Sequence, residues 1–345
     1  MTSTQIMLGG LSDNAIRWAT VVAALSLLAY AAQWAYSRER ATSDVDAKAA
    51  KRSLVGAGAP VDTVDTVDRQ FGVPDAVTTG AGVGVGESGT DDPGAAALRR
   101  RADLFGRLGF NFLAITGVVL LAGVVLRGVA AGRVPWSNMY EFATAGSAGI
   151  MCLFLVVRKR LKLTWLGFPL ICFILVVLML ADLLLYTPVS GLIPALKSYW
   201  LAIHVTAAVT ATAIFSLGGV ITVAQLVKAR AERRGSSALS KLPSSVKMEA
   251  VAYRLHAFAF PVWTFAMIAG AVWAQHAWGR FWGWDPKETW MFITWVAYAA
   301  YLHARSTPGW RGRIPWIALI AYGALLFNLV GVNVFITGLH SYAGV

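Results

Sequence analysis

Charged side chains are scarce in this sequence of 345 residues: they make up 14% of the chain, whereas hydrophobic residues make up 57%. A soluble domain carries about 25% charged residues, so a cytosolic enzyme of this composition would lack the charged surface that keeps it in water. The deficit coincides with long apolar runs, which are typical of chains that cross a membrane several times. The composition therefore excludes a cytosolic enzyme and predicts an all-α, polytopic membrane protein.

Cysteine is also sparse. The chain has two, Cys152 and Cys172, and each lies inside an apolar run. Neither belongs to a CxxC redox pair or to a CxxCH haem-attachment motif. A secreted scaffold held by disulfides is therefore excluded, and we expect no thiol chemistry from this chain.

The net charge of +12 is not a nucleic-acid signal. Residues 37–107 contain 10 Lys/Arg and 11 Asp/Glu, so the whole excess lies in the rest of the chain, with 20 Lys/Arg and 7 Asp/Glu. That excess forms short clusters between apolar runs, as the positive-inside rule describes. We interpret the charge as a signal of membrane topology and expect no nucleic-acid partner.

Apolar stretches of about 17–25 residues indicate membrane-spanning helices. The sequence contains about eight of them: 16–36, 107–129, 139–157, 164–186, 199–227, 252–274, 286–304 and 314–337. Basic clusters follow every second stretch, which places 24 of the 30 Lys and Arg residues on one side. We expect that side to be cytoplasmic and both termini to lie outside a cell membrane.

The chain divides into three predicted parts. Residues 1–40 form an N-terminal anchor, because their basic cluster follows the apolar stretch instead of preceding it as in a signal peptide. Residues 41–98 contain a repeated Val-Asp-Thr run and a single aromatic residue, so they cannot bury enough apolar area to offset the entropy of ordering. We predict a disordered cytoplasmic linker there and a functional core at 99–345.

Tryptophan is concentrated in one segment. Five of the 14 tryptophans lie within residues 273–290. An interfacial aromatic belt would spread them over many helix ends and would need no glycine. Because glycines alternate with aromatics here, we expect an apolar platform that a large planar ligand approaches closely. Its predicted members are Trp278, Gly279, Trp282, Gly283, Trp284, Asp285 and Trp290.

Asp285 also has a simpler role. It precedes a proline at the first helical position and a glutamate, Glu288, three residues on, which is the pattern of a capping box. We therefore predict that a helix starts at residue 286. By the same logic, Asn138 and Glu141 form a second capping pair at residue 139.

The predicted topology separates the five histidines. His204 and His340 lie near the outer ends of the fifth and eighth helices, beside the Trp-rich loop. His303 lies 17 residues into the seventh helix, about 26 Å from its start and close to the inner side. We interpret His256 and His276 as packing residues. Two imidazoles beside an aromatic platform favour haem, whose iron accepts neutral imidazole as axial ligand.

A resemblance to known proteins lies in the segment Trp278-Gly-Arg-Phe-Trp-Gly-Trp-Asp-Pro-Lys-Glu-Thr-Trp290. It resembles the WWD motif of haem-handling proteins and, in its extended form, the CcsA (ResC) family of system II cytochrome c biogenesis. Four further segments share the resemblance: Ser137–Glu141, Ser198–His204, Tyr301–His303 and Gly338–Tyr342. It spans about residues 107–345, so the first helix and the linker fall outside it.

The resemblance implies the haem-delivering subunit of a cytochrome c synthase. His204 and His340 match two external histidines that ligate haem iron, and His303 matches the transmembrane histidine that receives haem b from the cytoplasmic side. The second inner ligand belongs, in the family, to a partner of the ResB/CcsB type. The family presents reduced haem to the CxxCH motif of apocytochrome c, whose thiols add to the haem vinyl groups.

Two alternatives remain open from the residues. A haem exporter or haem chaperone without ligation activity needs similar ligands, although we find no internal repeat of the kind common in transporters. A cytochrome b needs paired histidines at similar depth, whereas His204 and His303 lie near opposite faces. We see no protein nucleophile or general base for thioether formation, so whether this chain alone is an enzyme is undecided.

Overall fold

The computed structural model describes residues 2–56, 93–189, 198–236, 239–240 and 242–340. The chain has two compact units, one of Met1–Ala31 with Gly106–Val345 and one of Ala32–Phe105. The smaller unit is formed by adjoining parts of two long helices, where Tyr36 stacks on Phe105 with ring centroids 5.5 Å apart. The larger unit contains all the predicted site residues.

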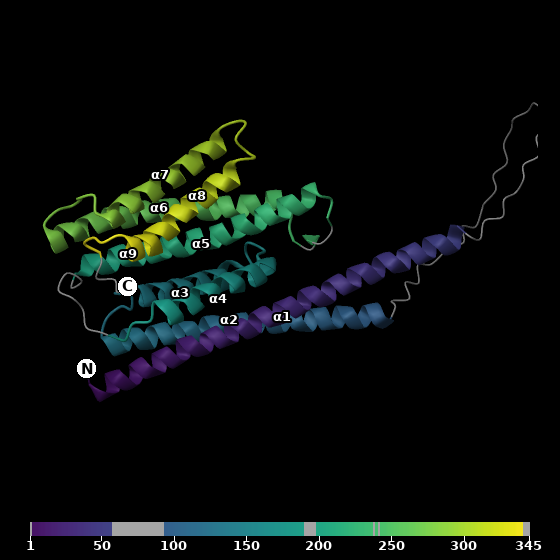
Figure 1. The fold of residues 1–345 in the computed structure, drawn as a ribbon, viewed down its shortest axis with the longest axis horizontal. Coiled ribbons are helices and arrows are strands. Elements are labelled where there is room, and N and C mark those ends of the chain that lie inside the picture. The colour runs from purple at the N-terminus through teal and green to yellow at the C-terminus, as the bar shows by residue number, and fades with distance from the viewer. Residues whose placement is uncertain (1, 57–92, 190–197, 237–238, 241, 341–345) are drawn as a thin grey trace, which may run out of the picture. The chain divides into compact units, whose positions relative to one another are not determined.

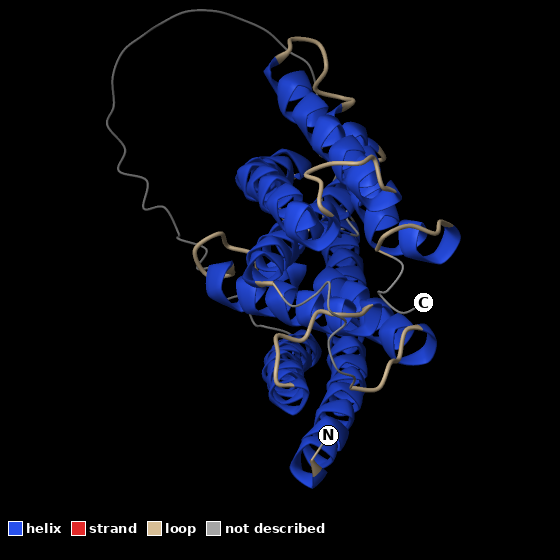
Figure 2. Cartoon of the chain, turned by 90° about the vertical axis from the view of Figure 1, so that its left-hand side faces the viewer, coloured by secondary structure: helices blue, strands red, loops and turns tan. Residues whose placement is uncertain are grey.

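Helices and loops make up the described chain, and Figure 2 shows no strand among these residues. The helices are α1 (Ser3–Gly56), α2 (Pro93–Ala131), α3 (Met139–Val157), α4 (Gly167–Leu184), α5 (Tyr199–Arg233), α6 (Ser245–Trp278), α7 (Pro286–Ser306), α8 (Ile314–Leu326) and α9 (Val332–Phe335). A π-helical turn, Phe327–Gly331, joins α8 to α9. The predicted all-α class is confirmed.

Seven of the described segments are long and apolar enough to cross a membrane, with Ile314–Phe335 counted as one. This confirms a polytopic membrane protein. The predicted eighth span, α7, does not meet the same criteria of length and composition. Its 21 residues extend about 31 Å, but charged residues at both ends and several Trp and Tyr make it less apolar.

The predicted linker is shorter than expected. Helix α1 continues to Gly56 and α2 begins at Pro93, so residues 41–56 and 93–98 are helical and not disordered. These stretches are rich in alanine with several Lys, Arg and Leu, which favour helix without needing a buried face. Residues 57–92 lie outside the described part, and disorder there remains a prediction.

Helices α1 and α2 pack through small residues. The Ser12 hydroxyl donates to the Gly123 carbonyl and the Ser26 hydroxyl to the Gly109 carbonyl, each at 2.8 Å. A Cβ on Gly123 would lie 2.9 Å from Ile16, so only glycine permits this approach. Close contact through Gly and Ser is how membrane helices associate when lipid is as apolar as the side chains.

Helices α5, α6, α7 and α8 form a bundle, and α3 packs against α5 with α4 beside it (Figure 1). The middle of this bundle is aromatic: the rings of Phe215 and Tyr298 stack with centroids 3.7 Å apart. Gly218 and Gly219 on α5 admit the rings of His256 and Tyr322, which a Cβ would meet at less than 3 Å. The core is therefore rigid between the two ends of the bundle.

The two ends of the bundle differ. In Figure 1 the start of α1, the start of α5, the α6–α7 loop and the end of α9 lie at one end. The basic connections after α3, α5 and α7 lie at the other. This arrangement agrees with an even number of passes and with the alternation of charge along the sequence.

A buried ion network ties α1, α2 and α3 together at the end that carries the α6–α7 loop. Arg127, whose side chain is 0% exposed, donates to Asp13 and Glu141 at 3.0 Å each and also to the Thr187 carbonyl. Glu141 is equally buried and accepts from Arg133 at 2.7 Å. Every member is paired, which buried charges require.

The second predicted capping pair is half correct. Asn138 caps α3, since its side chain accepts from the Glu141 amide at 2.8 Å. The Glu141 carboxylate does not return to the Asn138 amide as a capping box requires; it accepts from the Ser137 amide and from the two arginines. Two buried cations compete for this carboxylate and outweigh one backbone amide.

We expect Glu141→Gln to lower the stability of the protein by about 3 kcal/mol, because breaking one side of a buried ion pair leaves an uncompensated charge. The measurement is thermal or chemical unfolding of the purified protein in detergent. The control is Arg17→Gln, which removes an exposed pair with Asp182 at 3.6 Å and should cost less than about 1 kcal/mol. Equal shifts in the two variants would contradict the structural role of the network.

Candidate functional site

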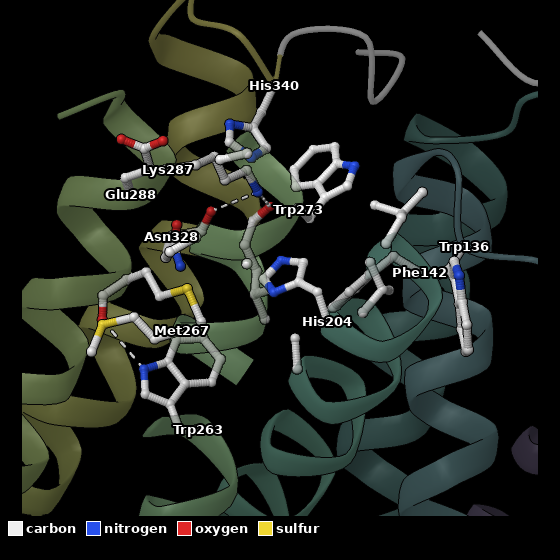
Figure 3. A pocket seen from close by; sticks show the side chains of 18 of the residues that line it. Trp136, Phe142, His204, Trp263, Met267, Trp273, Lys287, Glu288, Asn328 and His340 are labelled. Atoms are coloured by element: carbon white, nitrogen blue, oxygen red, sulfur yellow. Dashed lines mark hydrogen bonds between the residues drawn. The ribbon is translucent and has the colours of Figure 1, made fainter. Parts of the chain in front are cut away.

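A cavity opens at the end of the bundle that carries the Trp-rich loop (Figure 3). Its walls come from α3, α5, α6, α7, the π-helical turn after α8 and the segment after α9. The residues with large or polar side chains that line it are Trp136, Asn138, Met139, Phe142, His204, Trp263, Met267, Trp273, Trp278, Phe281, Trp282, Lys287, Glu288, Met291, Asn328 and His340. The walls are thus mostly aromatic and apolar, with two imidazoles among them.

His204 is held in a defined orientation on α5. Its Nδ1 lies 2.8 Å from the Ala266 carbonyl on α6, which assigns the ring proton to Nδ1 and leaves Nε2 as the metal-binding nitrogen. The imidazole lies against Gly270, where a Cβ would be 2.7 Å from ring atoms. Glycine at this position therefore makes the space for the imidazole.

His340 is oriented by a carboxylate. Its Nδ1 lies 2.7 Å from Asp285 Oδ2, so Nδ1–H donates and Nε2 carries the lone pair that a metal binds. Asp285 Oδ1 accepts from the Leu339 amide at 2.7 Å, and Gly338 permits the approach, since a Cβ there would be 2.7 Å from the same oxygen. The segment after α9 is thereby fixed against the start of α7.

Asp285 also caps α7, as predicted. Its side chain accepts from the Lys287 amide, and the Glu288 carboxylate accepts from the Asp285 amide at 3.1 Å, which completes the capping box. Burial alone would raise the pKa of Asp285, but hydrogen bonds from His340 and from the Leu339 and Lys287 amides outweigh it and hold that pKa below its usual value. The carboxylate is therefore charged at neutral pH.

Trp273 lies between the two histidines, as Figure 3 shows. Its ring is nearly parallel to that of His204, with centroids 6.0 Å apart, and it meets His340 at 5.7 Å. Trp278 packs edge-on against His340 at 4.9 Å. The sequence does contain a signal for Trp273: Ala266, Gly270 and Trp273 recur at helical spacing on one face of α6, the face that meets His204.

Only some of the tryptophans predicted to form the aromatic platform line the cavity. Trp278 and Trp282 line the cavity. Trp284 is 65% exposed and meets Trp282 edge-on, and Trp290 packs against Phe327 with centroids 4.2 Å apart. The chain turns sharply at Trp284, whose φ of 58° lies in the left-handed region directly before the cap of α7.

The two glycines of the loop have backbone roles. Gly279 ends α6 with φ at 73°, the left-handed conformation typical of the residue after a helix. Gly283 donates its amide to Glu288 at 2.8 Å and lies under the Arg280 guanidinium, which a Cβ would meet at 1.9 Å. Neither glycine is among the residues that line the cavity.

The other histidines lie elsewhere. His303 is exposed on α7 between buried Tyr301 and Ala304, toward the opposite end of the bundle. His256 lies 11 residues inside α6, because α6 begins at Ser245 and not at residue 252 as the apolar stretch predicted. It is fully buried, with its ring 5.4 Å from that of Tyr298. His276 is exposed and bonds to the carbonyl of its own preceding turn.

Lys287 lines the cavity but was not selected from the sequence pattern. Its ammonium group donates to the carbonyls of Asn328 and Leu329 at 2.9 and 3.4 Å, within the π-helical turn. A π-helical turn disturbs the regular pattern of backbone hydrogen bonds and is frequent at functional sites. The turn therefore brings a buried cation to the cavity wall.

The arrangement suits haem better than a bare metal ion. Among the residues that the structure describes, no three His, Cys, Asp or Glu side chains are grouped to hold a metal ion. Two imidazoles with fixed Nδ1 protons suit a metal that brings its own equatorial ligands, as haem iron does, and aromatic walls suit a porphyrin. The space at Gly270 and the carboxylate at His340 support this fit.

Comparisons with known proteins give one consistent result. The profile of the family described as Cytochrome C assembly protein matches residues 136–340. The cytochrome c biogenesis protein CcsA of Synechococcus elongatus is 33% identical over 282 residues, covering 68% of this chain and 87% of that relative. CcsA of Prochlorococcus marinus is 32% identical over 259 residues (67% and 82%), and CcsA of Porphyra purpurea is 33% identical over 281 residues (68% and 88%).

We expect Asp285→Asn to weaken haem binding while α7 stays capped. An Asn side chain has one acceptor oxygen, so it cannot accept from both the Leu339 amide and His340. Because Oδ2 both caps α7 at the Lys287 amide and meets His340, an Asn that keeps the cap turns its NH₂ group toward the Leu339 amide. That amide then loses its acceptor, and the segment that carries His340 is no longer held against α7. Absorbance titration with haem should show a Kd raised about tenfold or more.

The matched control for this substitution is Asp103→Asn, which changes an exposed aspartate in the other compact unit and should leave the Kd unchanged. Asp285→Leu should in addition lower the unfolding temperature, since it removes the cap. Wild-type haem affinity in Asp285→Asn would show that the carboxylate only caps α7.

Proposed function

Because the chain belongs to the cytochrome c assembly protein family and acts in cytochrome c biogenesis, we propose that it binds haem b in this cavity and presents it to apocytochrome c. The observation that carries the proposal is the pair His204 and His340. Both imidazoles pack within 6.0 Å of the Trp273 ring centroid, and both have Nδ1 hydrogen-bonded. Each therefore has Nε2 set to ligate iron from one side of the cavity.

The chain's residues hold the haem in one orientation. His204 and His340 supply two axial ligands, so that oxygen finds no open position on ferrous iron. Trp273, Trp278 and Trp282 exclude water from the porphyrin. The buried Lys287 ammonium offsets negative charge on the haem carboxylates. The protein thus holds the haem reduced and in one position before its transfer.

Thioether formation needs no nucleophile from this chain. The thiols belong to the CxxCH motif of apocytochrome c and add across the haem vinyl groups, so each S–H proton ends on the vinyl carbon. The cavity contributes by holding the haem in a fixed orientation while the peptide approaches. This lowers the entropy cost of bringing the thiols and the vinyl groups together. This supports a role as the haem-delivering subunit of a cytochrome c synthase.

The proposed orientation follows the charge of the two ends. The connections after α3, α5 and α7 each contain a cluster of Lys and Arg residues, and by the positive-inside rule they face the cytoplasm of a cell membrane. The cavity and the Trp-rich loop then lie on the extracytoplasmic side. Haem presented there meets an apocytochrome that has already crossed the membrane.

His303 supports a second, inner haem site shared with a partner. It is exposed on α7 toward the cytoplasmic end, with the buried Tyr301 and Ala304 turned to the bundle. Its ring therefore faces lipid or another protein. A ResB/CcsB-type membrane protein would supply the second imidazole, and haem would pass from this inner site to the outer cavity.

We expect His204→Ala or His340→Ala to convert bound haem from a six-coordinate low-spin spectrum to a five-coordinate or high-spin one and to reduce haem retention. Added imidazole should partly restore the low-spin spectrum, because it replaces the missing ligand. His276→Ala, an exposed histidine in the same part of the molecule, is the control. An unchanged spectrum in the double variant would overturn the assignment.

A second experiment distinguishes a cytochrome c synthase subunit, which delivers haem for covalent attachment, from a protein that only delivers haem. Co-expression with a partner and a CxxCH reporter should yield covalent haem with the wild-type chain. Low-spin haem without any covalent product, under conditions where the reporter is exported, would favour a haem exporter or chaperone.

We expect His303→Ala to lower the haem content of the complex with the partner much more than that of the chain alone. One imidazole without a second ligand binds haem weakly, whereas the complex would hold a bis-imidazole site. The measurement is haem per protein in both preparations, each with and without the substitution. An equal loss in both would show that the inner site is complete in this chain, and no loss in either would make His303 a packing residue.

A further inference from the structure

A second large cavity lies at the opposite, basic end of the α5–α8 bundle. Its volume is about 880 Å³. The last turns of α5, the start of α6, the end of α7 and residues 311–316 at the start of α8 form its walls. The lining residues on which the argument depends are Arg230, Arg233, Val246, Arg305, Arg311 and Trp316.

The cavity has a strong excess of positive charge. Four arginines from three different elements line it, and Glu249 is the one acid among the described lining residues. That acid is already paired with Arg305, which also lies over the Tyr253 ring at 4.2 Å. Arg230, Arg233 and Arg311 therefore line a cavity in which the one carboxylate among the described residues already has a partner, an arrangement that favours an anion.

The cavity is also apolar on one side. Val246 is 73% exposed, Trp316 59% and Val227 55%, and all three belong to the lining. Exposed Val and Trp beside arginines are unfavourable in water but are suited to the boundary between headgroups and hydrocarbon. A ligand that satisfies both sides has an anionic head and an apolar tail.

The position along α5 agrees with that boundary. Arg230 follows His204 by 26 residues, which is about 39 Å of helix. The hydrocarbon core of a bilayer is about 30 Å thick. If the haem cavity lies near one surface, the arginines lie in the headgroup layer of the other, where lipid phosphates are found.

We propose that this inner arginine cavity binds the phosphate headgroup of an anionic phospholipid, with the acyl chains lying along Val246 and Trp316. The guanidinium groups would donate paired hydrogen bonds to phosphate oxygens. Because the walls come from α5, α6, α7 and α8, the bound lipid joins the inner ends of all four helices. One of these ends carries His303, so the lipid stabilises the part of α7 that the proposed partner contacts.

The test uses the full chain, purified in detergent and stripped of lipid, without added haem. Phosphatidylglycerol is titrated, and binding is followed by native mass spectrometry and by the unfolding temperature. Phosphatidylcholine and inorganic phosphate are titrated in parallel to distinguish an anionic lipid from any lipid and from a free anion. We expect phosphatidylglycerol alone to bind stoichiometrically and to raise the unfolding temperature.

Two triple variants separate the cavity from the general charge of this end. The first is Arg230→Gln with Arg233→Gln and Arg311→Gln. The control is Arg234→Gln with Arg254→Gln and Arg313→Gln, which removes the same charge from residues that are exposed and do not line the cavity. We expect the first triple to bind phosphatidylglycerol about tenfold more weakly or worse and the control to match the wild type.

Each other outcome overturns the proposal. An equal loss in both triples would indicate a diffuse surface potential, and equal stabilisation by inorganic phosphate would indicate a free-anion site. If the first triple keeps its lipid but loses haem in the complex with the partner, the arginines belong to the haem path. Should the first triple fail to fold, the single variant Arg311→Gln, in an exposed loop, is compared with Arg313→Gln in the same titration.

Discussion

The hydrogen bonds of the Asp285 carboxylate are the interactions on which the cavity beside the Trp-rich loop depends. The carboxylate caps α7, accepts the Leu339 amide and accepts the ring proton of His340. One buried charge thus joins two segments more than 50 residues apart and sets which nitrogen of His340 faces a metal. The capping box with Glu288 keeps the carboxylate in place, so a local folding device also serves as the orienting group of the proposed ligand.

Small residues make the rest of the site possible. Gly270 admits the His204 ring to the surface of α6, and Gly338 admits the chain to Asp285. Between the two imidazoles, Trp273 supplies a wall that contacts both rings. The turn from α2 into α3, from which Trp136 and Phe142 reach the cavity, is fixed by the buried charges of Arg127 and Glu141. Rigid positioning matches a function that places two reactants and leaves the chemistry to them.

The two ends of the bundle are built for different neighbours. The end with the Trp-rich loop buries its charges in networks and lines its cavity with aromatic side chains. The opposite end exposes arginines beside apolar residues, which is the basis of the proposed lipid site. The aromatic core around Phe215 and Tyr298 separates them. If His303 holds an inner haem as proposed, the packed centre of α5–α8 closes a direct path to the cavity, and the exposed face of α7 offers a route around it.

The sequence by itself determined the all-α membrane class, most helix positions, the cap at residue 286 and the family, because hydropathy, capping and a long motif are local properties. It also selected His204 and His340, which topology places at one end. Only the tertiary structure decided that Trp273 lies between them, that Lys287 reaches the cavity through a π-helical turn, and that Trp284 and Trp290 lie outside it. Those outcomes depend on which helix faces pack together and on the hydrogen bonds that Asp285 forms with the segment after α9. Contacts between residues far apart in the chain leave no local pattern from which to read them.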